Sequence, residues 1–375
     1  MQIGVPSEVK NHEYRVAVTP AGAHHLVAAG HTLTVQAGAG AGSLITDQEY
    51  AAAGADVVDG PEAADRVWAE ADLVIKVKEP VAQEYHRLRP DLVLFTYLHL
   101  AADRPLTDRL LAAGTTSIGY ETVQLADRSL PLLAPMSEIA GRLAPQVGAY
   151  HLMRNEGGRG VLLGGVPGVT NGKVVVLGGG VSGMHAAEIA LGMRADVTVL
   201  DLSIPVLRRL DAHFSGSVRT LASTAFSIAE ELREADLVIG AVLVPGARAP
   251  KLVTNQLVSE MKPGSVLVDI AVDQGGCFED THPTTHAEPT FTVHDSVFYC
   301  VANMPGAVPR TSTFALTNAT LPYITAVADR GWQQALSADP ALAAGLHTSG
   351  GRLTNEPVGR AHGIRCVALG SVLLG

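Results

Sequence analysis

The chain has 375 residues, of which 47% are hydrophobic and 17% charged, and its formal net charge is −10. This composition is typical of a compact globular protein, and the length exceeds what a single core usually supports, so we expect two domains. The acidic balance and the lack of any clustered Lys/Arg block argue against nucleic acid and anionic lipid as partners. A small-molecule ligand is therefore favoured.

The sequence carries no sign of export or membrane insertion. The opening segment "MQIGVPSEVK" has no apolar leader, and no stretch reaches the roughly 18 uninterrupted apolar residues that a membrane span needs. Cys277, Cys300 and Cys366 are odd in number, far apart and without a CxxC pair, which argues against a disulfide framework or a zinc knuckle. We expect a cytoplasmic protein with no membrane segment and with reduced thiols.

Short apolar runs alternate with helix-period segments along the chain, which predicts an α/β fold with parallel sheets and crossover helices. A helix over 19–30 is predicted to start with Thr19 as N-cap and Pro20 as first helical residue. The helix over 46–54 begins with a capping-box pattern. This part is predicted to be a doubly wound unit of its own, with strands at 1–5, 32–38, 71–77 and 91–98.

A long helical pattern over 137–155, perturbed at Pro145, is followed by a turn-rich segment, so a domain boundary is expected nearby. A second alternating series comes next. From about residue 307 the pattern contains no further strand series and predicts helices, which are expected to pack back on the first domain. The strands predicted in the second series lie at 173–177, 196–200, 235–244 and 265–273, and the series ends within 298–309.

Gly178, Gly180 and Gly183 form a G-x-G-x-x-G motif between the predicted strand at 173–177 and a predicted helix. In this context the first glycine permits a tight turn, the second lets the backbone approach a pyrophosphate, and the third lets helix and strand pack closely. The N-terminus of the helix supplies amide donors and a partial positive charge to the phosphates. The motif therefore predicts a dinucleotide site.

Asp201 stands eighteen residues after the last glycine of the motif, at the end of the next predicted strand. A carboxylate at this place accepts hydrogen bonds from the ribose hydroxyls and repels a 2'-phosphate, which favours NAD over NADP. Arg208 and Arg209 downstream keep NADP open, and FAD or another adenosine cofactor is a further alternative.

Three polar residues stand at or near predicted strand ends, where ligands bind in open α/β sheets: Lys78 in "VIKVKEP", His99 in "LFTYLHL" and Asp273 in "VLVDIAVDQGG". Each residue also has a purely structural interpretation. Lys78 would be a solvated lysine before a turn, His99 a core histidine with its hydrogen bonds made, and Asp273 a helix or turn cap. Their joint appearance in both halves favours a site between two domains. Lys76 is predicted to be a snorkelling or edge residue and Asp269 a structural one.

A metal site is considered at "THPTTHAEPTFTVHD", which contains His282, His286 and His294 downstream of Cys277. Their spacing matches no standard zinc pattern, and an exposed polar loop is favoured, so we expect no metal. Neither a G-x-S-x-G elbow nor a Walker A loop is present, so acyl transfer and P-loop phosphoryl transfer lack their usual marks.

Several segments resemble the bacterial L-alanine dehydrogenase family. They are "GVPSEVKNHEYRVAVTP", "VIKVKEP", "LFTYLHLA", "LPLLAPMSEIAGRLAPQVGAYHLM", "DIAVDQGGCFE" and "YCVANMPGAVPRTST", and the similarity covers nearly the whole chain. The N-terminal half is more distantly similar to the soluble part of proton-translocating transhydrogenase. The resemblance implies two Rossmann-like domains joined by long helices and a homohexamer. The domains expected are a substrate domain at 1–132 completed by C-terminal helices at 307–375, and an NAD domain at 133–306.

The resemblance also implies an activity, the reversible NAD-dependent deamination of L-alanine to pyruvate and ammonium. It implies that Arg15 and Lys78 hold the pyruvate carboxylate, that His99 is the catalytic acid/base and that Asp273 is a second catalytic group. The cofactor contacts that it implies are Ser137, Asp201 and Asn303. Rival functions are a transhydrogenase subunit, a dehydrogenase of a larger amino acid and a catalytically silent NAD-binding protein.

Overall fold

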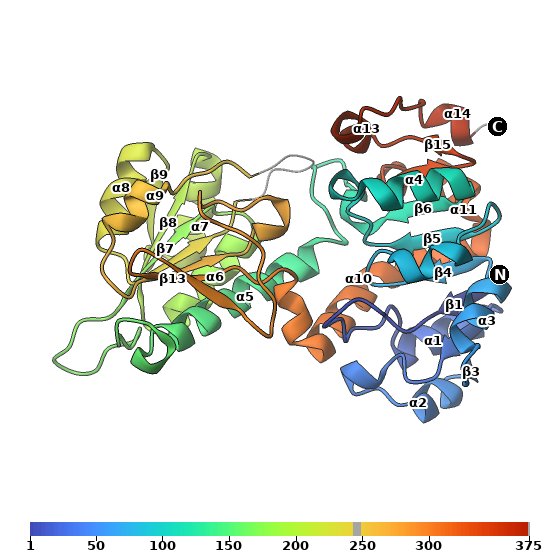
Figure 1. Cartoon of the computed structure of the whole chain (residues 1–375), viewed down its shortest axis with the longest axis horizontal. Helices are drawn as coiled ribbons and strands as arrows, with labels where there is room; N and C mark the ends of the chain where they lie inside the picture. Colours follow the sequence, from blue (N-terminus) through green and yellow to red (C-terminus); the bar gives the residue numbers. More distant parts are fainter. Residues whose placement is uncertain (243–248, 374–375) are drawn as a thin grey trace. The chain divides into compact units, whose positions relative to one another are not determined.

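The computed structural model describes residues 1–242 and 249–373 (Figure 1). The described chain divides into two compact units. Unit 1 consists of residues 1–136 and 308–375, and unit 2 consists of residues 137–307. Each unit is built on one sheet with helices around it, so the predicted α/β class is confirmed.

Unit 1 contains an eight-stranded sheet with the strand order β15-β14-β6-β5-β4-β1-β2-β3. β1 to β6 are parallel to one another, whereas β14 runs antiparallel to β6 and β15 antiparallel to β14. The expectation that residues 307–375 form only helices is therefore wrong, because β14 and β15 lie within them. The strands are β1 (Gln2–Val5), β2 (Thr32–Gln36), β3 (Asp56–Val58), β4 (Leu73–Ile75), β5 (Val93–Thr96), β6 (Thr116–Gly119), β14 (Leu346–Ser349) and β15 (Arg352–Leu353).

The first helices of unit 1 begin where their capping residues predict. Thr19 accepts a hydrogen bond from the amide of Gly22 at the start of α1, and the capping box of α2 is formed by Thr46 and Glu49. Leu353 and Val358 of the C-terminal segment pack in one core with Leu94 and Leu98, so this segment belongs to the core of unit 1. The helices are α1 (Pro20–Ala28), α2 (Asp47–Ala52), α3 (Ala63–Glu70), α4 (Arg104–Ala113), α10 (Pro309–Arg330), α11 (Trp332–Ala338), α12 (Pro340–Ala343), α13 (Glu356–His362) and α14 (Gly370–Leu373).

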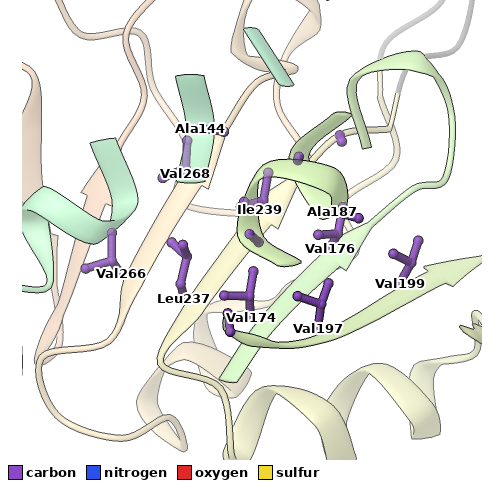
Figure 2. Packing of buried hydrophobic residues seen from close by; sticks show 14 of the residues in the cluster. Ala144, Val174, Val176, Ala187, Val197, Val199, Leu237, Ile239, Val266 and Val268 are labelled. Carbon is purple, nitrogen blue, oxygen red and sulfur yellow. The ribbon is translucent and has the colours of Figure 1, made fainter. Parts of the chain in front are cut away.

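Unit 2 contains a seven-stranded sheet with the order β12-β13-β11-β10-β7-β8-β9, parallel except for β12 against β13. Its apolar strand residues pack against helices, as Figure 2 shows for Val176 and Ala187. β9 and β12 have no counterpart in the predicted series, and residues 243–244 of the strand expected at 235–244 lie outside the described residues. The strands are β7 (Lys173–Leu177), β8 (Asp196–Asp201), β9 (Arg219–Ala222), β10 (Leu237–Gly240), β11 (Val266–Asp269), β12 (Thr290–Val293) and β13 (Ser296–Tyr299).

The long helix α5 (Ala134–His151) keeps Pro145 inside it, close to the helix predicted over 137–155. Two of its glycines let it pack closely: a Cβ on Gly141 would lie 2.3 Å from the carbonyl oxygen of Ser182, and one on Gly148 would lie 2.5 Å from Leu237 Cδ1. Among the described residues, no helix is long and apolar enough to cross a membrane. The other helices of unit 2 are α6 (Val181–Gly192), α7 (Ile204–Phe214), α8 (Ala225–Arg233) and α9 (Asn255–Ser259).

Candidate active site

Two glycines of the G-x-G-x-x-G motif are required by the backbone of unit 2 itself. Gly178 has a φ of +99°, and a Cβ on it would lie 2.8 Å from the carbonyl oxygen of Ala241. A Cβ on Gly183 would lie 1.8 Å from the carbonyl oxygen of Gly178. The first and third glycines therefore form the tight turn and the close helix–strand contact that the motif predicts.

Gly180 is different, because nothing in the described protein explains why it is a glycine. No described atom lies within 4 Å of a Cβ placed on it, and its φ of −68° suits any residue. It is the N-cap of α6, and no described side chain caps that helix end by a hydrogen bond. The first backbone amides of α6 can therefore donate hydrogen bonds to an anion that approaches the backbone of Gly180 closely. The loop fits a dinucleotide pyrophosphate.

Asp201 ends β8 and holds the glycine loop from one side. Its Oδ2 accepts a hydrogen bond from the amide of Gly179 at 2.7 Å, and its Oδ1 accepts one from the amide of Ser203 at 2.7 Å. Each carboxylate oxygen has a second lone pair with which to accept from a ribose hydroxyl. Arg209, one of the two arginines for which the sequence leaves NADP as an alternative, donates a hydrogen bond to the carbonyl oxygen of Gly179 at 3.3 Å.

Asp273 lies in a short 3₁₀ turn (Val272–Gln274) after β11 and is exposed. The turn is anchored by the buried Asp269, which accepts hydrogen bonds from the amide of Ala271 at 3.0 Å and from the amide of Cys277 at 2.8 Å. Burial raises the pKa of Asp269. Asp269 thus has the structural place expected of it. Lys251, which sequence reasoning missed, donates to two carbonyl oxygens of the same loop, those of Gly275 and Phe278.

Two further predicted cofactor contacts lie in unit 2. Asn303 follows β13 and has a φ of 64°, a left-handed conformation that asparagine tolerates better than most residues. Its carbonyl oxygen lies 3.3 Å from Nε2 of His286, so this histidine of the polar loop contacts the segment that carries Asn303. Ser137 lies in the first turn of α5 and is half-buried.

In unit 1, neighbouring strands lead to the predicted substrate residues. β5, β4 and β1 are adjacent and parallel, so their carboxyl ends lie at one edge of the sheet (Figure 1). Lys78 comes three residues after β4 and His99 three residues after β5, while Arg15 lies ten residues beyond β1. This edge is where ligands bind in open α/β sheets.

His99 has a left-handed backbone with φ 49° and ψ 32°, and its side chain is exposed. Its amide donates to Oε1 of Glu121 at 2.7 Å, and its ring stacks on Tyr97 with the ring centroids 5.8 Å apart. Tyr97 is itself fixed, because its hydroxyl donates to the carbonyl oxygen of Leu132 at 2.6 Å. The imidazole is therefore held on a rigid support, with its ring accessible.

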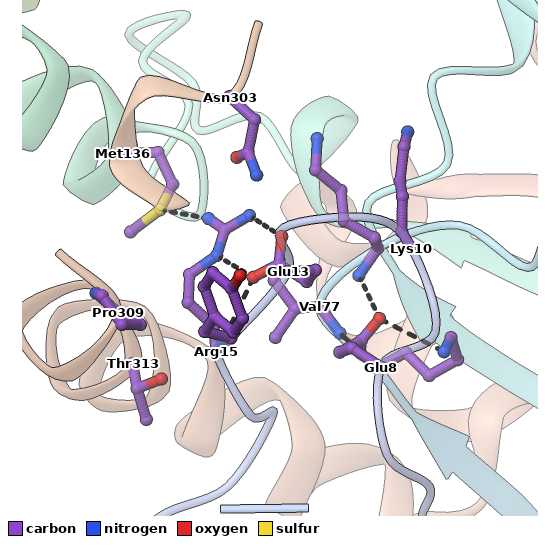
Figure 3. A network of polar contacts seen from close by, with 12 residues as sticks. Glu8, Lys10, Glu13, Arg15, Val77, Met136, Asn303, Pro309 and Thr313 are labelled. Atoms are coloured by element: carbon purple, nitrogen blue, oxygen red, sulfur yellow. Dashed lines mark hydrogen bonds and ion pairs between the residues drawn. The ribbon is translucent and has the colours of Figure 1, made fainter. Parts of the chain in front are cut away.

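Arg15 is only 2% exposed and forms a bidentate pair with Glu13 (Figure 3). Its Nε lies 2.6 Å from Oε1 and its Nη2 lies 2.5 Å from Oε2 of Glu13, while Nη1 lies 3.0 Å from Sδ of Met136. Burial alone would raise the pKa of Glu13, but Arg15 outweighs this effect and, with a smaller contribution from Lys78, holds that pKa below its usual value. Arg15, Glu13 and Lys78 thus form one electrostatic group.

Lys78 is 7% exposed and lies near a second buried carboxylate, that of Glu79. Burial would raise the pKa of Glu79, but Lys78, then Lys10 and then His99 lower it below its usual value. The charges of Lys78 and, to a smaller extent, His99 thus act on the same carboxylate. The prediction for Lys76 is wrong: this lysine is fully buried and ion-paired with Glu8 and Glu84, so it neither snorkels nor lies at an edge.

Among the residues that the structure describes, no group of three or more His, Cys, Asp or Glu side chains is arranged to hold a metal ion. The dinucleotide loop of unit 2 and the basic side chains with a histidine in unit 1 are typical of nicotinamide-dependent dehydrogenases of small anionic substrates.

Comparisons with known proteins agree with this class. The model "Alanine dehydrogenase/PNT, N-terminal domain" matches residues 4–140, and "Alanine dehydrogenase/PNT, C-terminal domain" matches residues 144–356. The alanine dehydrogenase of Mycolicibacterium smegmatis is 63% identical over 360 residues, which is 96% of each chain. A solved L-alanine dehydrogenase matches with a TM-score of 0.92 and 52% identity, covering 96% of this chain and 99% of that one. A transhydrogenase from Sinorhizobium meliloti matches with a TM-score of 0.79 and 26% identity, covering 94% and 98%.

The chain belongs to the alanine dehydrogenase/PNT family.

Proposed function

We propose that this protein is an NAD-dependent L-alanine dehydrogenase, which catalyses the reversible oxidative deamination of L-alanine to pyruvate and ammonium. The observation that carries the proposal is the grouping of Arg15, Lys78 and His99 at one sheet edge of a chain that also has a dinucleotide loop. Relatives named alanine dehydrogenase, 63% and 61% identical to this chain, support it.

In this proposal Arg15 and Lys78 bind the substrate carboxylate. The guanidinium is oriented before substrate arrives, because Glu13 holds two of its nitrogens. Lys78 adds a point charge on a buried stem. Two cations that are already partly desolvated bind a carboxylate more strongly than the same groups would in water. No metal is needed for this step.

The bound NAD supplies the hydride acceptor at its nicotinamide ring. The residues proposed to hold it are Gly178, Gly180 and Gly183 at the pyrophosphate, Asp201 at the ribose, and Ser137 and Asn303 as further contacts. His99 is proposed to take and return protons as the amine is converted to a carbonyl group, since an imidazole serves in both directions near neutral pH. Asp273 is proposed to accept a proton from ammonia or from the carbinolamine hydroxyl, and to stabilise the iminium cation by its negative charge.

A transhydrogenase subunit is the second candidate, because the Sinorhizobium meliloti transhydrogenase has a related fold. Transhydrogenation exchanges hydride between two nucleotides and has no use for a carboxylate site. Arg15 and Lys78 supply positive charge at one sheet edge, which suits a small anionic substrate.

The direct test is to add L-alanine and NAD to the purified protein and to quantify NADH, pyruvate and ammonium together. The proposal expects equal amounts of the three products, and little NADPH when NADP replaces NAD. NADH formed without pyruvate and ammonium would contradict it.

We also propose that the enzyme is a homohexamer in the cytoplasm. Exposed apolar side chains on the end of α5 and on the turns that follow it support self-association: Tyr150, Met153, Leu162, Val166 and Val169. The hexamer itself is the assembly that the family resemblance implies. The free thiols of the three cysteines in the described chain suit a reducing compartment. Light scattering should give six times the 39.0 kDa of one chain, and Leu162→Glu should reduce that mass.

A further inference from the structure

Unit 1 buries a group of three charged side chains beside the segment that carries Lys78. Lys76 Nζ lies 3.2 Å from Oε2 of Glu8 and 3.0 Å from Oε1 of Glu84, and the three side chains are 0%, 3% and 1% exposed in that order. Two carboxylates face one ammonium, so the group has a net negative charge when all three residues are ionised. We call Glu8, Lys76 and Glu84 the buried triad.

The carboxylates of the buried triad also bind the backbone that follows β4. Glu8, labelled in Figure 3 beside Val77, accepts a hydrogen bond from the amide of Val77 at 2.6 Å. It accepts a second one from the amide of Lys78 at 3.3 Å. Glu84 accepts one from the amide of Val81 at 3.0 Å. β4 ends at Ile75, so these amides lie beyond the strand. Carboxylate oxygens accept their hydrogen bonds in place of the carbonyl oxygens that a neighbouring strand would provide in a sheet. The segment around Lys78 is thus held at three backbone positions.

Stability alone does not account for the buried triad. Taking charges out of water costs several kcal/mol per ion, and replacing such groups by apolar side chains often leaves a protein as stable or more stable. Burial raises the pKa of Glu8 in spite of the opposing charge of Lys76. What apolar side chains would not provide is the set of hydrogen-bond acceptors for the amides of Val77, Lys78 and Val81.

We propose that the buried triad is a set of positioning residues for Lys78, which fixes the backbone from which the lysine reaches the substrate carboxylate. The inference rests on the proposed function, because it takes Lys78 to be a substrate-binding residue. Glu8 is the central member, since it alone binds Lys76 and the amide of Lys78 together. The triad acts on carboxylate affinity and leaves the dinucleotide loop of unit 2 untouched.

The first variant is Glu8→Gln, which keeps the size of the side chain but places an NH₂ group against one of the two amides. We expect the KM for pyruvate to rise about tenfold or more, kcat to change less than about threefold, and the Kd for NADH to stay the same. Glu70→Gln is the matched control, because Glu70 is an exposed carboxylate of unit 1 paired with Arg66. Its kinetic constants should equal those of the wild type.

A double-mutant cycle with Lys78→Ala separates positioning from a general loss of structure. If Glu8 acts through Lys78, adding Glu8→Gln to Lys78→Ala should raise the KM for pyruvate by less than about twofold further. Fully additive effects on KM would overturn the inference. So would an unchanged pyruvate KM in Glu8→Gln alone.

The apolar triple variant Glu8→Leu/Lys76→Met/Glu84→Met is the second test. We expect it to fold and to keep NADH binding, with a lowered thermal midpoint because the amides of Val77, Lys78 and Val81 lose their acceptors, and to lose pyruvate affinity about tenfold or more. A folded triple variant with the wild-type KM for pyruvate would overturn the inference. If the triple variant does not fold, the double-mutant cycle of Glu8→Gln with Lys78→Ala is the test of the inference. Wild-type turnover is measured in the same assay, and a wild type without pyruvate-dependent turnover would remove the proposed function and the inference with it.

Discussion

The carboxylate of Glu121 accepts a hydrogen bond at 2.7 Å from the amide of His99, and both of its oxygens lie 3.2 Å from the amide nitrogen of Leu98. This contact holds His99 in a left-handed conformation, which costs a residue other than glycine on the order of 1–3 kcal/mol. The contacts around the strand end therefore stabilise this unfavourable backbone conformation of the histidine. A histidine with only a packing role would not need such a fixed and exposed position.

Replacing His99 should abolish most turnover without affecting cofactor binding. His99→Asn is the sharper variant, because asparagine tolerates the left-handed backbone and removes only the proton-transferring ring. We expect kcat to fall roughly 100-fold or more, while NADH binding measured by fluorescence is retained. Turnover near the wild-type level would remove His99 from the mechanism.

Gly183 and Gly180 of the motif should respond differently to alanine. Gly183→Ala forces a Cβ to within 1.8 Å of a carbonyl oxygen and should lower the thermal midpoint by several degrees or prevent folding. Gly180→Ala meets no described atom within 4 Å, so it should fold normally and yet weaken NAD binding about tenfold or more. Gly192→Ala, at the other end of α6 and equally unhindered, is the control for both measurements. Wild-type NAD affinity in Gly180→Ala would mean that the pyrophosphate does not approach this loop.

Asp201→Ala should lower NAD affinity and raise the relative use of NADP, since it removes the carboxylate that would repel a 2'-phosphate. It also removes the acceptor of the Gly179 and Ser203 amides, so part of the loss should come from a looser glycine loop. Asp196→Ala, at the exposed start of the same strand, is the control. The ratio of kcat/KM for the two cofactors is the measurement, and an unchanged ratio would place Asp201 away from the ribose.

Protein stability should fall below neutral pH because of His347 on β14. Burial lowers the pKa of this histidine. The charge of Glu121 acts in the opposite direction and raises it, while His99 lowers it further. A histidine with a lowered pKa in the folded state takes up its proton on unfolding, so stability rises with pH below about 6.5 and is lost as pH falls through the folded-state pKa.

The thermal midpoint at about pH 5.5 should therefore be lower than at about pH 7.5, and His347→Gln should reduce this difference. His24→Gln, on the exposed side of α1, should leave the difference unchanged. An equal pH dependence in His347→Gln and the wild type would assign the effect to other groups.

Features set by neighbouring residues could be predicted from the sequence. The capping residues of α1 and α2, the strand–glycine loop–helix unit and the strand ends before Lys78 and His99 all depend on short stretches of chain. The position of Asp269 inside a predicted strand indicates a structural role, and its hydrogen bonds to the amides of Ala271 and Cys277 agree with that prediction.

Features that depend on distant pairing could not be predicted. β14 joins the sheet by pairing antiparallel with β6, more than 200 residues earlier, and short strands of this kind carry little periodicity. The two acidic partners of Lys76 lie outside its own strand: Glu8 is far away in the sequence, and Glu84 lies in a separate 3₁₀ segment, Ala82–Arg87. Nothing near Glu121 or Lys251 in the sequence indicates their contacts, whereas Glu13 stands only two residues from Arg15, a spacing that is compatible with a local ion pair.

The most direct measurement is the loss of NADH when pyruvate and ammonium are supplied separately and together. The proposed function predicts oxidation of NADH only when both are present, with L-alanine and NAD as products, and loss of that activity in Lys78→Ala at low pyruvate. Equal rates without ammonium would make the protein a reductase of the keto group alone, and no oxidation under any of the three conditions would contradict the assignment of pyruvate as substrate.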